Sequence, residues 1–212
     1  MRIAVIGAGH VGSPIAGRLA DRGHDVVLAA ESPNSETIQR ARAQWPKLSA
    51  ATTRDAVSRA DVVFLAVPFT AVESALTSAG PLENKILVDC TNPVGPGLEH
   101  ALDSQRSGAE VVRDAAPDVA VVKAFTIYGF ENLRDSRYPG YGDLQPAMLI
   151  AGDDDQAKRV VSGFCRDLGF EPVDAGPLSS SLHLEHLTLL WIKMARVQGQ
   201  GAGLVWGRLT RP

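Results

Sequence analysis

The stretch Arg2-Ile-Ala-Val-Ile-Gly-Ala-Gly-His-Val-Gly12 stands near the start of the chain and decides its fold. Residues 2–6 form the apolar run of a short buried strand, and residues 13–21 carry apolar side chains at helical spacing. A glycine-rich turn between a strand and a helix points free N–H groups and the positive end of the helix dipole at an anion. We therefore predict that the turn binds the pyrophosphate of a dinucleotide through Gly7, Ala8, Gly9, His10, Val11 and Gly12.

Further apolar runs follow along the chain, and helical patterns separate most of them. Strands are expected at residues 2–6, 25–29, 49–51, 61–67, 85–89, 119–124, 146–151 and 170–174. A run that is apolar on both faces, such as 61–67, is typical of a parallel sheet covered by helices. The pattern predicts an α/β fold with a doubly wound, mostly parallel sheet of Rossmann type. We expect this domain to span residues 1–176, followed by a C-terminal helical segment at 177–212.

The composition narrows the class of protein. The 212 residues carry a net charge of −3, which argues against a nucleic-acid partner. No apolar run is long enough to cross a bilayer, and the chain shows no signal-peptide pattern. The two cysteines, Cys90 and Cys165, have neither paired spacing nor a metal-ligand pattern. We expect a cytoplasmic protein without a membrane partner or a metal, whose partner is a small-molecule coenzyme or substrate.

The loop after the second strand sets the cofactor preference. In this fold a carboxylate there hydrogen-bonds the ribose 2′-hydroxyl of NAD, whereas an arginine accommodates the 2′-phosphate of NADP. The residues here are Ala30, Glu31 and Ser32, and no lysine or arginine follows before Arg40. Glu31 would repel a phosphate, so this loop favours NAD, unless the carboxylate points into solvent.

Three more loops lie at the carboxyl ends of strands, where an open parallel sheet binds its ligands. We expect Val67, Pro68 and Phe69 to contact the cofactor through the backbone. Asn92 and Pro93 are placed at the nicotinamide end, where the Asn92 amide either orients the ring or serves as a turn residue before proline. Ala124 ends the sixth strand and is expected at the same end of the cofactor.

The histidines and aspartates have simpler interpretations than catalysis. His100 is expected on the surface of a helix that includes residues 98–102. His183 and His186 lack the further ligand that zinc needs, so we interpret them as polar-face residues of the last helix. Asp153, Asp154 and Asp155 are interpreted as helix-capping residues. We identify no catalytic residue, because no nucleophile–base pair is visible.

The last helical pattern, which starts near Ser179, is apolar on most of its circumference. Such a helix is buried. The preceding domain leaves it little to bury against, and we therefore expect a homodimer that uses this helix as its interface.

Several stretches together resemble one family. They are IAVIGAGHVGSPIAGRLADRGHDVVL, AVPFTAV, VDCTNPVGPGLEHAL, VVKAFTIYGFENL and DAGPLSSSLHLEHLTLLWIKMA, in this order. The chain resembles the coenzyme F420-dependent NADP oxidoreductases, which pass hydride between NADPH and a deazaflavin. The resemblance implies NADP as cofactor, with a planar partner stacked on the nicotinamide. It implies a pocket for that partner at Lys123, Phe125, Thr126, Tyr128 and Leu178. Family members that use NADP commonly have Ser-Arg where this chain has Ala30-Glu31.

These observations favour an NAD(P)-dependent oxidoreductase that moves hydride between the nicotinamide and a planar acceptor, with coenzyme F420 as the acceptor implied by the resemblance. Transfer between two bound coenzymes needs placement and a dry site rather than a protein acid. One alternative is a reductase of a small carbonyl or imine, with an acid among Lys123, Tyr128, His183 and His186. The other alternative is a non-catalytic dinucleotide sensor.

Overall fold

One mostly parallel sheet of eight strands forms the centre of the molecule. The computed structural model describes residues 1–211, and the strands are arranged in the order β3-β2-β1-β4-β5-β6-β7-β8. Their bounds are Arg2–Ile6 (β1), Asp25–Ala29 (β2), Ser49–Ala51 (β3), Val62–Leu65 (β4), Ile86–Asp89 (β5), Ala120–Lys123 (β6), Ala147–Gly152 (β7) and Glu171–Asp174 (β8). All eight predicted strands are present, and the predicted fold class is confirmed.

The sheet changes direction once. β1 to β6 pair in parallel, whereas β7 is antiparallel to β6 and pairs in parallel with β8. The register places Asp89 of β5 beside Lys123 of β6, and Lys123 beside Ala151 of β7. The ends of three strands therefore meet at one edge of the sheet, beyond which an open sheet of this kind binds its ligands.

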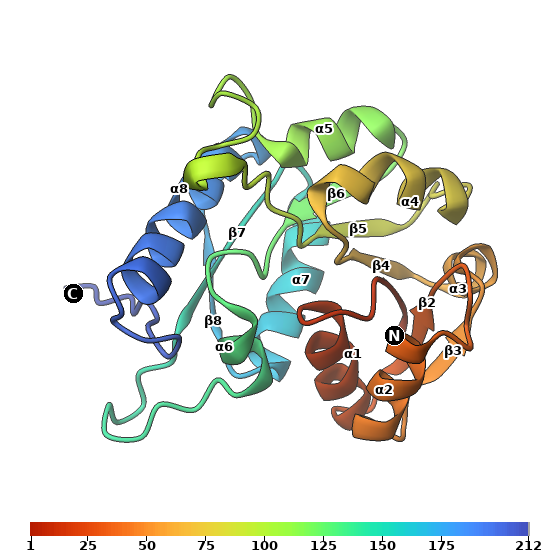
Figure 1. The fold of residues 1–212 in the computed structure, drawn as a ribbon, viewed down its shortest axis with the longest axis horizontal. Coiled ribbons are helices and arrows are strands. Elements are labelled where there is room, and N and C mark those ends of the chain that lie inside the picture. Colours follow the sequence, from red (N-terminus) through yellow and green to blue (C-terminus); the bar gives the residue numbers. More distant parts are fainter. Residues whose placement is uncertain (212) are drawn as a thin grey trace.

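Helices cover both faces of the sheet (Figure 1). They are Gly12–Asp21 (α1), Glu36–Gln44 (α2), Thr53–Arg59 (α3), Val72–Ala79 (α4), Gly108–Ala115 (α5), Phe130–Arg134 (α6), Asp155–Asp167 (α7) and Ser181–Ile192 (α8). One apolar core includes Ile15 of α1 and Phe164 of α7, and a second core includes Val57 of α3 and Val112 of α5. Asp154 caps α7 by accepting from the Ala157 amide at 2.7 Å, as predicted.

The predicted helix at 98–102 is absent. Residues Pro96–Leu98 form a short 3₁₀ turn, followed by an isolated bridge between Val94 and His100. Gly97 has a φ of 69° and Leu98 a φ of 59°. Both values lie in the left-handed region, which interrupts a right-handed helix.

The C-terminal helix α8 shares the core of the sheet domain. Trp191 is buried in the same apolar cluster as Ile15 and Phe164, and its Nε1 donates to the Leu204 carbonyl at 2.7 Å. The expectation that α8 has little to bury against within its own chain is therefore wrong. Within residues 1–211, no helix combines the length and the apolar character that a membrane crossing requires.

Candidate functional site

The glycine loop joins β1 to α1, and each of its glycines has a distinct environment. Gly7 has a φ of +99°, and a Cβ built on it would lie 2.4 Å from the Ala66 carbonyl oxygen. A Cβ on Gly12 would lie 1.8 Å from the Gly7 carbonyl oxygen, whereas a Cβ on Gly9 would meet nothing within 4 Å. Gly7 and Gly12 are thus required by the fold, and Gly9 faces open space.

The amides of this loop are free to bind a ligand. Within the described residues, the N–H groups of residues 8–12 donate to no backbone carbonyl, and the first such bond after the strand runs from the Ser13 amide to the Gly9 carbonyl at 3.0 Å. The loop leads into the N-terminus of α1, which carries no acidic residue in its first turn. Consecutive free amides at the positive end of a helix form an anion-binding site.

A pocket of about 260 Å³ adjoins the loop at the ends of β1 and β2. It is lined by Gly7, Ala8, Ala30, Glu31 and Val67 from the predicted set, and Ser32, Pro68 and Phe69 are not among its lining residues. The lining contains no lysine or arginine among the described residues, and the Ser78 hydroxyl donates to Glu31 Oε1 at 3.3 Å. The pocket therefore presents a carboxylate and hydroxyl groups, as recognition of a ribose requires.

Sequence reasoning missed the hydroxyl groups that α4 contributes to this pocket. Ser74 and Ser78 stand one helical turn apart on α4, and both line the pocket. A four-residue spacing places two side chains on the same helix face. That spacing was the signal available in the sequence.

The structure brings Asn92 and Thr126 together beyond the ends of β5 and β6. The Asn92 amide nitrogen donates to the Thr126 carbonyl at 3.3 Å, and Thr188 of α8 donates to the same carbonyl at 3.0 Å. The Thr126 hydroxyl is buried and, within residues 1–211, has no hydrogen-bond partner. Pro93, Ala124 and Phe125 are buried next to them, and Phe125 has a φ of 60°. A non-glycine residue in this region carries backbone strain, which concentrates at functional sites.

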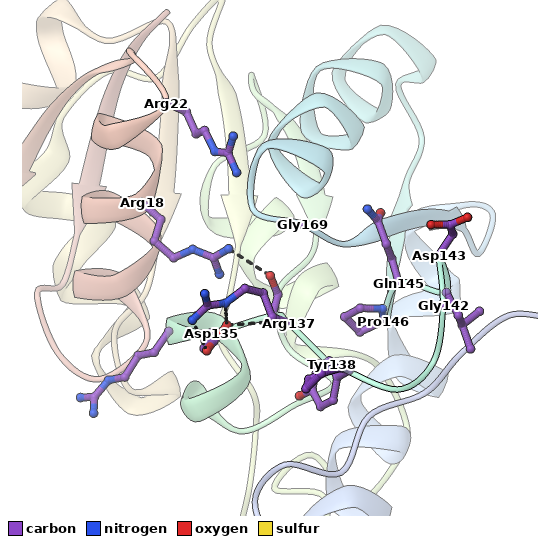
Figure 2. A pocket seen from close by; sticks show the side chains of 14 residues that line it. Arg18, Arg22, Asp135, Arg137, Tyr138, Gly142, Asp143, Gln145, Pro146 and Gly169 are labelled. Carbon is purple, nitrogen blue, oxygen red and sulfur yellow. Dashed lines mark hydrogen bonds and ion pairs between the residues drawn. The ribbon is translucent and has the colours of Figure 1, made fainter.

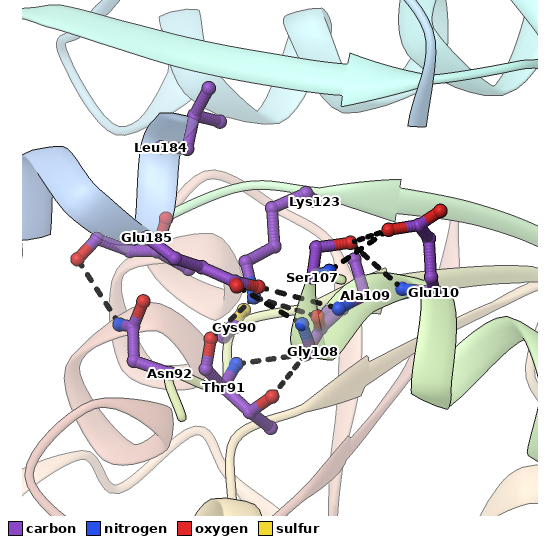
Figure 3. A network of polar contacts seen from close by, with 12 residues as sticks. Cys90, Thr91, Asn92, Ser107, Gly108, Ala109, Glu110, Lys123, Leu184 and Glu185 are labelled. Carbon is purple, nitrogen blue, oxygen red and sulfur yellow. Dashed lines mark hydrogen bonds and ion pairs between the residues drawn. The ribbon is translucent and has the colours of Figure 1, made fainter. Parts of the chain in front are cut away.

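Lys123 belongs to a buried ionic network rather than to an open pocket (Figure 3). Its Nζ contacts Asp89 Oδ2 and Glu185 Oε1, each at 2.9 Å, and donates to the Thr91 carbonyl at 2.6 Å. The Lys123 and Asp89 side chains are completely buried. The expectation that Lys123 contacts substrate is not supported by this placement, because all three of its protons have acceptors.

Glu185 connects this network to α5 and to His100. Its carboxylate accepts from the amides of Gly108 at 3.0 Å and Ala109 at 3.3 Å, which are the first two residues of α5. It also lies 2.8 Å from His100 Nε2. The His100 Nδ1 accepts from the Leu102 amide at 3.2 Å, so the proton of the neutral ring is on Nε2. The expectation of a surface-exposed His100 is therefore wrong, whereas His183 and His186 are exposed on α8, as expected of polar-face residues.

The charges of this network stabilise one another. Burial alone would lower the pKa of the Lys123 ammonium, but Asp89 and Glu185 outweigh burial and raise that pKa above its ordinary value. One cation thus stands between two carboxylates, and the N-terminus of α5 supplies further positive potential. The neighbouring Cys90 is inert, because burial raises the pKa of its thiol well above the usual value.

Tyr128 and Leu178, two other predicted substrate residues, are part of the packing. The Tyr128 hydroxyl donates to the Ala147 carbonyl and accepts from the Trp206 amide at 3.2 Å, so it ties the C-terminal tail to β7. Leu178 is 2% exposed and lies in the apolar core that includes Val112. The two side chains hold the C-terminal segment in place.

The free amides, the adjoining pocket and the eight-stranded sheet define the class of the protein, which is that of the Rossmann-type dinucleotide-binding proteins. More particularly, residues 2–93 match the family described as NADP oxidoreductase coenzyme F420-dependent. The resemblance seen in the sequence is confirmed by this match.

Proteins that resemble this chain in sequence or in structure are named after different reactions. A crystal structure of a candidate F420-dependent NADP reductase from Arthrobacter sp. FB24 is 28% identical, with a TM-score of 0.86 and 96% of both chains covered. Metalloreductase STEAP3 of Rattus norvegicus is 33% identical over 189 residues, which are 89% of this chain and 36% of the relative. A glycerol-3-phosphate dehydrogenase [NAD(P)+] of Chlorobium phaeobacteroides is 31% identical over 142 residues, which are 61% of this chain and 41% of the relative.

This chain therefore spans less than half the length of the curated relatives it matches. The names of these relatives differ in what is reduced or oxidised. All three names describe a reductase or a dehydrogenase, but they do not agree on the substrate.

Proposed function

We propose that the protein transfers hydride between a nicotinamide dinucleotide and a deazaflavin coenzyme of the F420 type. The observation that carries the dinucleotide half of this proposal is the run of free amides at residues 8–12, next to a pocket that contains Glu31. The family match over residues 2–93 and the similarity to the Arthrobacter protein support the deazaflavin half.

The residues of the chain would hold and orient the two coenzymes. The loop amides bind the pyrophosphate, and Glu31 accepts a hydrogen bond from a ribose hydroxyl. The buried Thr126 hydroxyl, which has no partner among the described residues, fits a polar group of a ligand bound beside Asn92. When bound, the nicotinamide would supply the carbon that donates or accepts the hydride, and reduction of the deazaflavin takes up one proton from solvent in addition to that hydride. The contribution of the protein is positioning and exclusion of water.

A reductase of a small carbonyl or imine is less well supported. Such a reaction needs a proton donor within reach of the substrate. Lys123 has three acceptors for its protons, and burial raises the pKa of the Tyr128 hydroxyl above its ordinary value. Of the other candidates, His186 hydrogen-bonds Ser104 and His183 is exposed on α8. Neither Lys123 nor Tyr128 presents an accessible acid.

The test mixes purified protein, NADH or NADPH, and oxidised deazaflavin, and follows the absorbance bands of both coenzymes. We expect the nicotinamide and deazaflavin bands to fall together with one-to-one stoichiometry. A protein that binds NADH but leaves both bands unchanged would disprove deazaflavin reduction. It would point instead to a dinucleotide sensor or to another acceptor.

Glu31 is expected to make NADH the preferred dinucleotide. Glu31→Arg should remove the acceptor for the 2′-hydroxyl of NADH and provide a charge-assisted hydrogen bond to the 2′-phosphate of NADPH. The affinity for NADPH relative to that for NADH should therefore rise by about tenfold or more. Fluorescence titration of both variants with NADH and NADPH measures the ratio of the two dissociation constants. Glu36→Arg makes the same charge change at an exposed position that does not line the pocket, and should leave the ratio unaltered. An equal shift in both variants would show that net charge, rather than Glu31, sets the preference.

We propose in addition that the protein is a homodimer that associates through the outer side of α8 and the turn after it. Leu190 is 47% exposed and Val197 is 68% exposed, which leaves large apolar side chains in water. Light scattering is expected to give the mass of two chains of 22.5 kDa at micromolar concentration. Leu190→Lys should shift the mass to one chain, whereas Tyr141→Lys, an equally drastic change on the loop before β7, should not. A monomeric wild-type protein would rule out the dimer.

A further inference from the structure

The histidine of the glycine loop is covered by a side chain from α6. The His10 ring stacks on the Phe130 ring with 4.5 Å between centroids and an interplanar angle of 21°. Phe130 is the first residue of α6, a short helix that packs against α1. A segment more than a hundred positions later in the chain thus lies directly beside the predicted pyrophosphate loop.

Arg134, at the end of the same helix, completes this group. Its guanidinium carbon lies 4.9 Å from the centroid of the Phe130 ring, and its Nη2 lies 3.5 Å from His10 Nδ1. Arg134 is exposed, and within residues 1–211 it takes part in no ion pair. An arginine without a carboxylate partner, stacked beside a row of free amides, is available to an anion.

Three other arginines share a groove with Arg134; two of them already bind other groups, and the third, Arg22, is the C-cap of α1, at the opposite end of that helix from the glycine loop. Arg134 lines an open groove of about 970 Å³, whose lining also includes Arg18 and Arg137, both labelled in Figure 2. Arg18 donates to the Leu133 carbonyl at 2.8 Å and to the Leu168 carbonyl at 2.6 Å, and Arg137 pairs with Asp135 at 2.8 Å. Arg18 thus connects separate segments of the chain and Arg137 is paired with a carboxylate, whereas Arg134 has no such partner among the described residues.

We propose that Arg134, stacked on Phe130 and next to His10, closes over the glycine loop and binds the pyrophosphate of the dinucleotide. The inference rests on the proposed dinucleotide site and adds to it a cation that the glycine motif does not contain. The loop and the first turns of α1 carry no lysine or arginine before Arg18, which is committed elsewhere. The two negative charges of a pyrophosphate therefore meet amides from one side and the Arg134 guanidinium from the other. Phe130 holds that guanidinium through a cation–π contact, and His10 through the polar contact at Nδ1.

The test compares Arg134→Ala with Arg137→Ala, which removes the same charge from the same groove. Fluorescence titration with NADH is expected to show a dissociation constant about tenfold higher for Arg134→Ala and little changed for Arg137→Ala. ADP-ribose contains the pyrophosphate and adenosine does not. In Arg134→Ala the dissociation constant of ADP-ribose, measured by competition, should therefore rise by the same factor as that of NADH. The dissociation constant of adenosine should stay the same. The salt dependence of NADH binding should also become shallower in Arg134→Ala, because one cation–phosphate contact is lost.

Two conservative variants separate charge from stacking. Arg134→Lys keeps the charge but loses the planar group, and Phe130→Leu keeps an apolar contact but loses the aromatic face. Both should show intermediate affinity, with melting temperatures close to that of the wild type. Equal dissociation constants for wild type, Arg134→Ala and Arg137→Ala would overturn the inference while leaving the dinucleotide site intact. A wild-type protein that binds neither NADH nor NADPH would instead overturn the proposed function, and the inference with it.

Discussion

Replacement of Lys123 by methionine is expected to lower the free energy of unfolding by about 3–5 kcal/mol, which is the usual cost of removing one partner from a buried ion pair. The ammonium lies between Asp89 and Glu185, both 2.9 Å away, and all three side chains are at most 1% exposed. Methionine fills a similar volume but leaves two buried carboxylates facing each other. Urea denaturation followed by circular dichroism measures the loss.

Two further variants test this explanation. Lys47→Met removes a lysine whose pair with Asp21 is exposed, with the two side chains 63% and 53% accessible, so it should cost less than about 1 kcal/mol. In the double variant Lys123→Met with Glu185→Gln, one carboxylate becomes neutral. The double variant should therefore lose less stability than the sum of the two single variants. Additive losses, or a cost for Lys123→Met no larger than for Lys47→Met, would contradict the assigned role of Lys123.

Alanine at Gly9 and at Gly12 is expected to weaken dinucleotide binding strongly, for two different reasons. The Cβ on Gly9 meets nothing within 4 Å, so Gly9→Ala should fold with wild-type stability and fill the space that the pyrophosphate needs. The Cβ on Gly12 would lie 1.8 Å from the Gly7 carbonyl oxygen, so Gly12→Ala must displace the loop and should unfold at a lower temperature. We expect NADH affinity to fall by about a hundredfold in both, an energy of about 3 kcal/mol.

Gly163 provides the matched control for these variants. It lies within α7, and a Cβ there also meets nothing within 4 Å. Gly163→Ala should stabilise the protein by about 0.5–1 kcal/mol, because alanine favours a helix more than glycine does, and should leave NADH binding unchanged. Calorimetry and NADH titration on the three variants give both quantities. Unimpaired binding by Gly9→Ala would show that the open space above Gly9 is not the pyrophosphate site.

The strands and the glycine loop could be predicted because their signals are local. Each strand is a short apolar run closed by a polar or small residue, and the eight observed strands agree with the expected runs to within two residues at each end. The helix predicted at 98–102 is absent because Gly97 and Leu98 adopt left-handed backbone conformations, which the apolar spacing of the sequence does not reveal. The glycine loop was predictable because three requirements each place a glycine at a fixed position. These are the sharp turn after the strand, the close approach of the backbone to the pyrophosphate and the packing of the helix on the strand.

The buried network could not be predicted from neighbours in sequence. Lys123 and Asp89 are separated by 34 positions, and His100 and Glu185 by 85 positions. Only the pairing of β5 with β6 places an acid and a base side by side at the ends of two apolar strands. The placement of Lys123, Tyr128 and Leu178 at a ligand came from the family resemblance. Their burial follows from α8 and the C-terminal tail, whose positions no local pattern reveals.

The two caps of α5 have a consequence for the order in which the chain can fold during synthesis. Ser107 caps α5 locally by accepting from the Glu110 amide, whereas the first two amides of the helix are satisfied by Glu185, which is translated 77 codons after Gly108. Buried amides without acceptors are costly. The nascent chain can therefore assemble the first strands early, but α5 and the edge of the sheet around Lys123 reach their final state only after α8 has emerged from the ribosome.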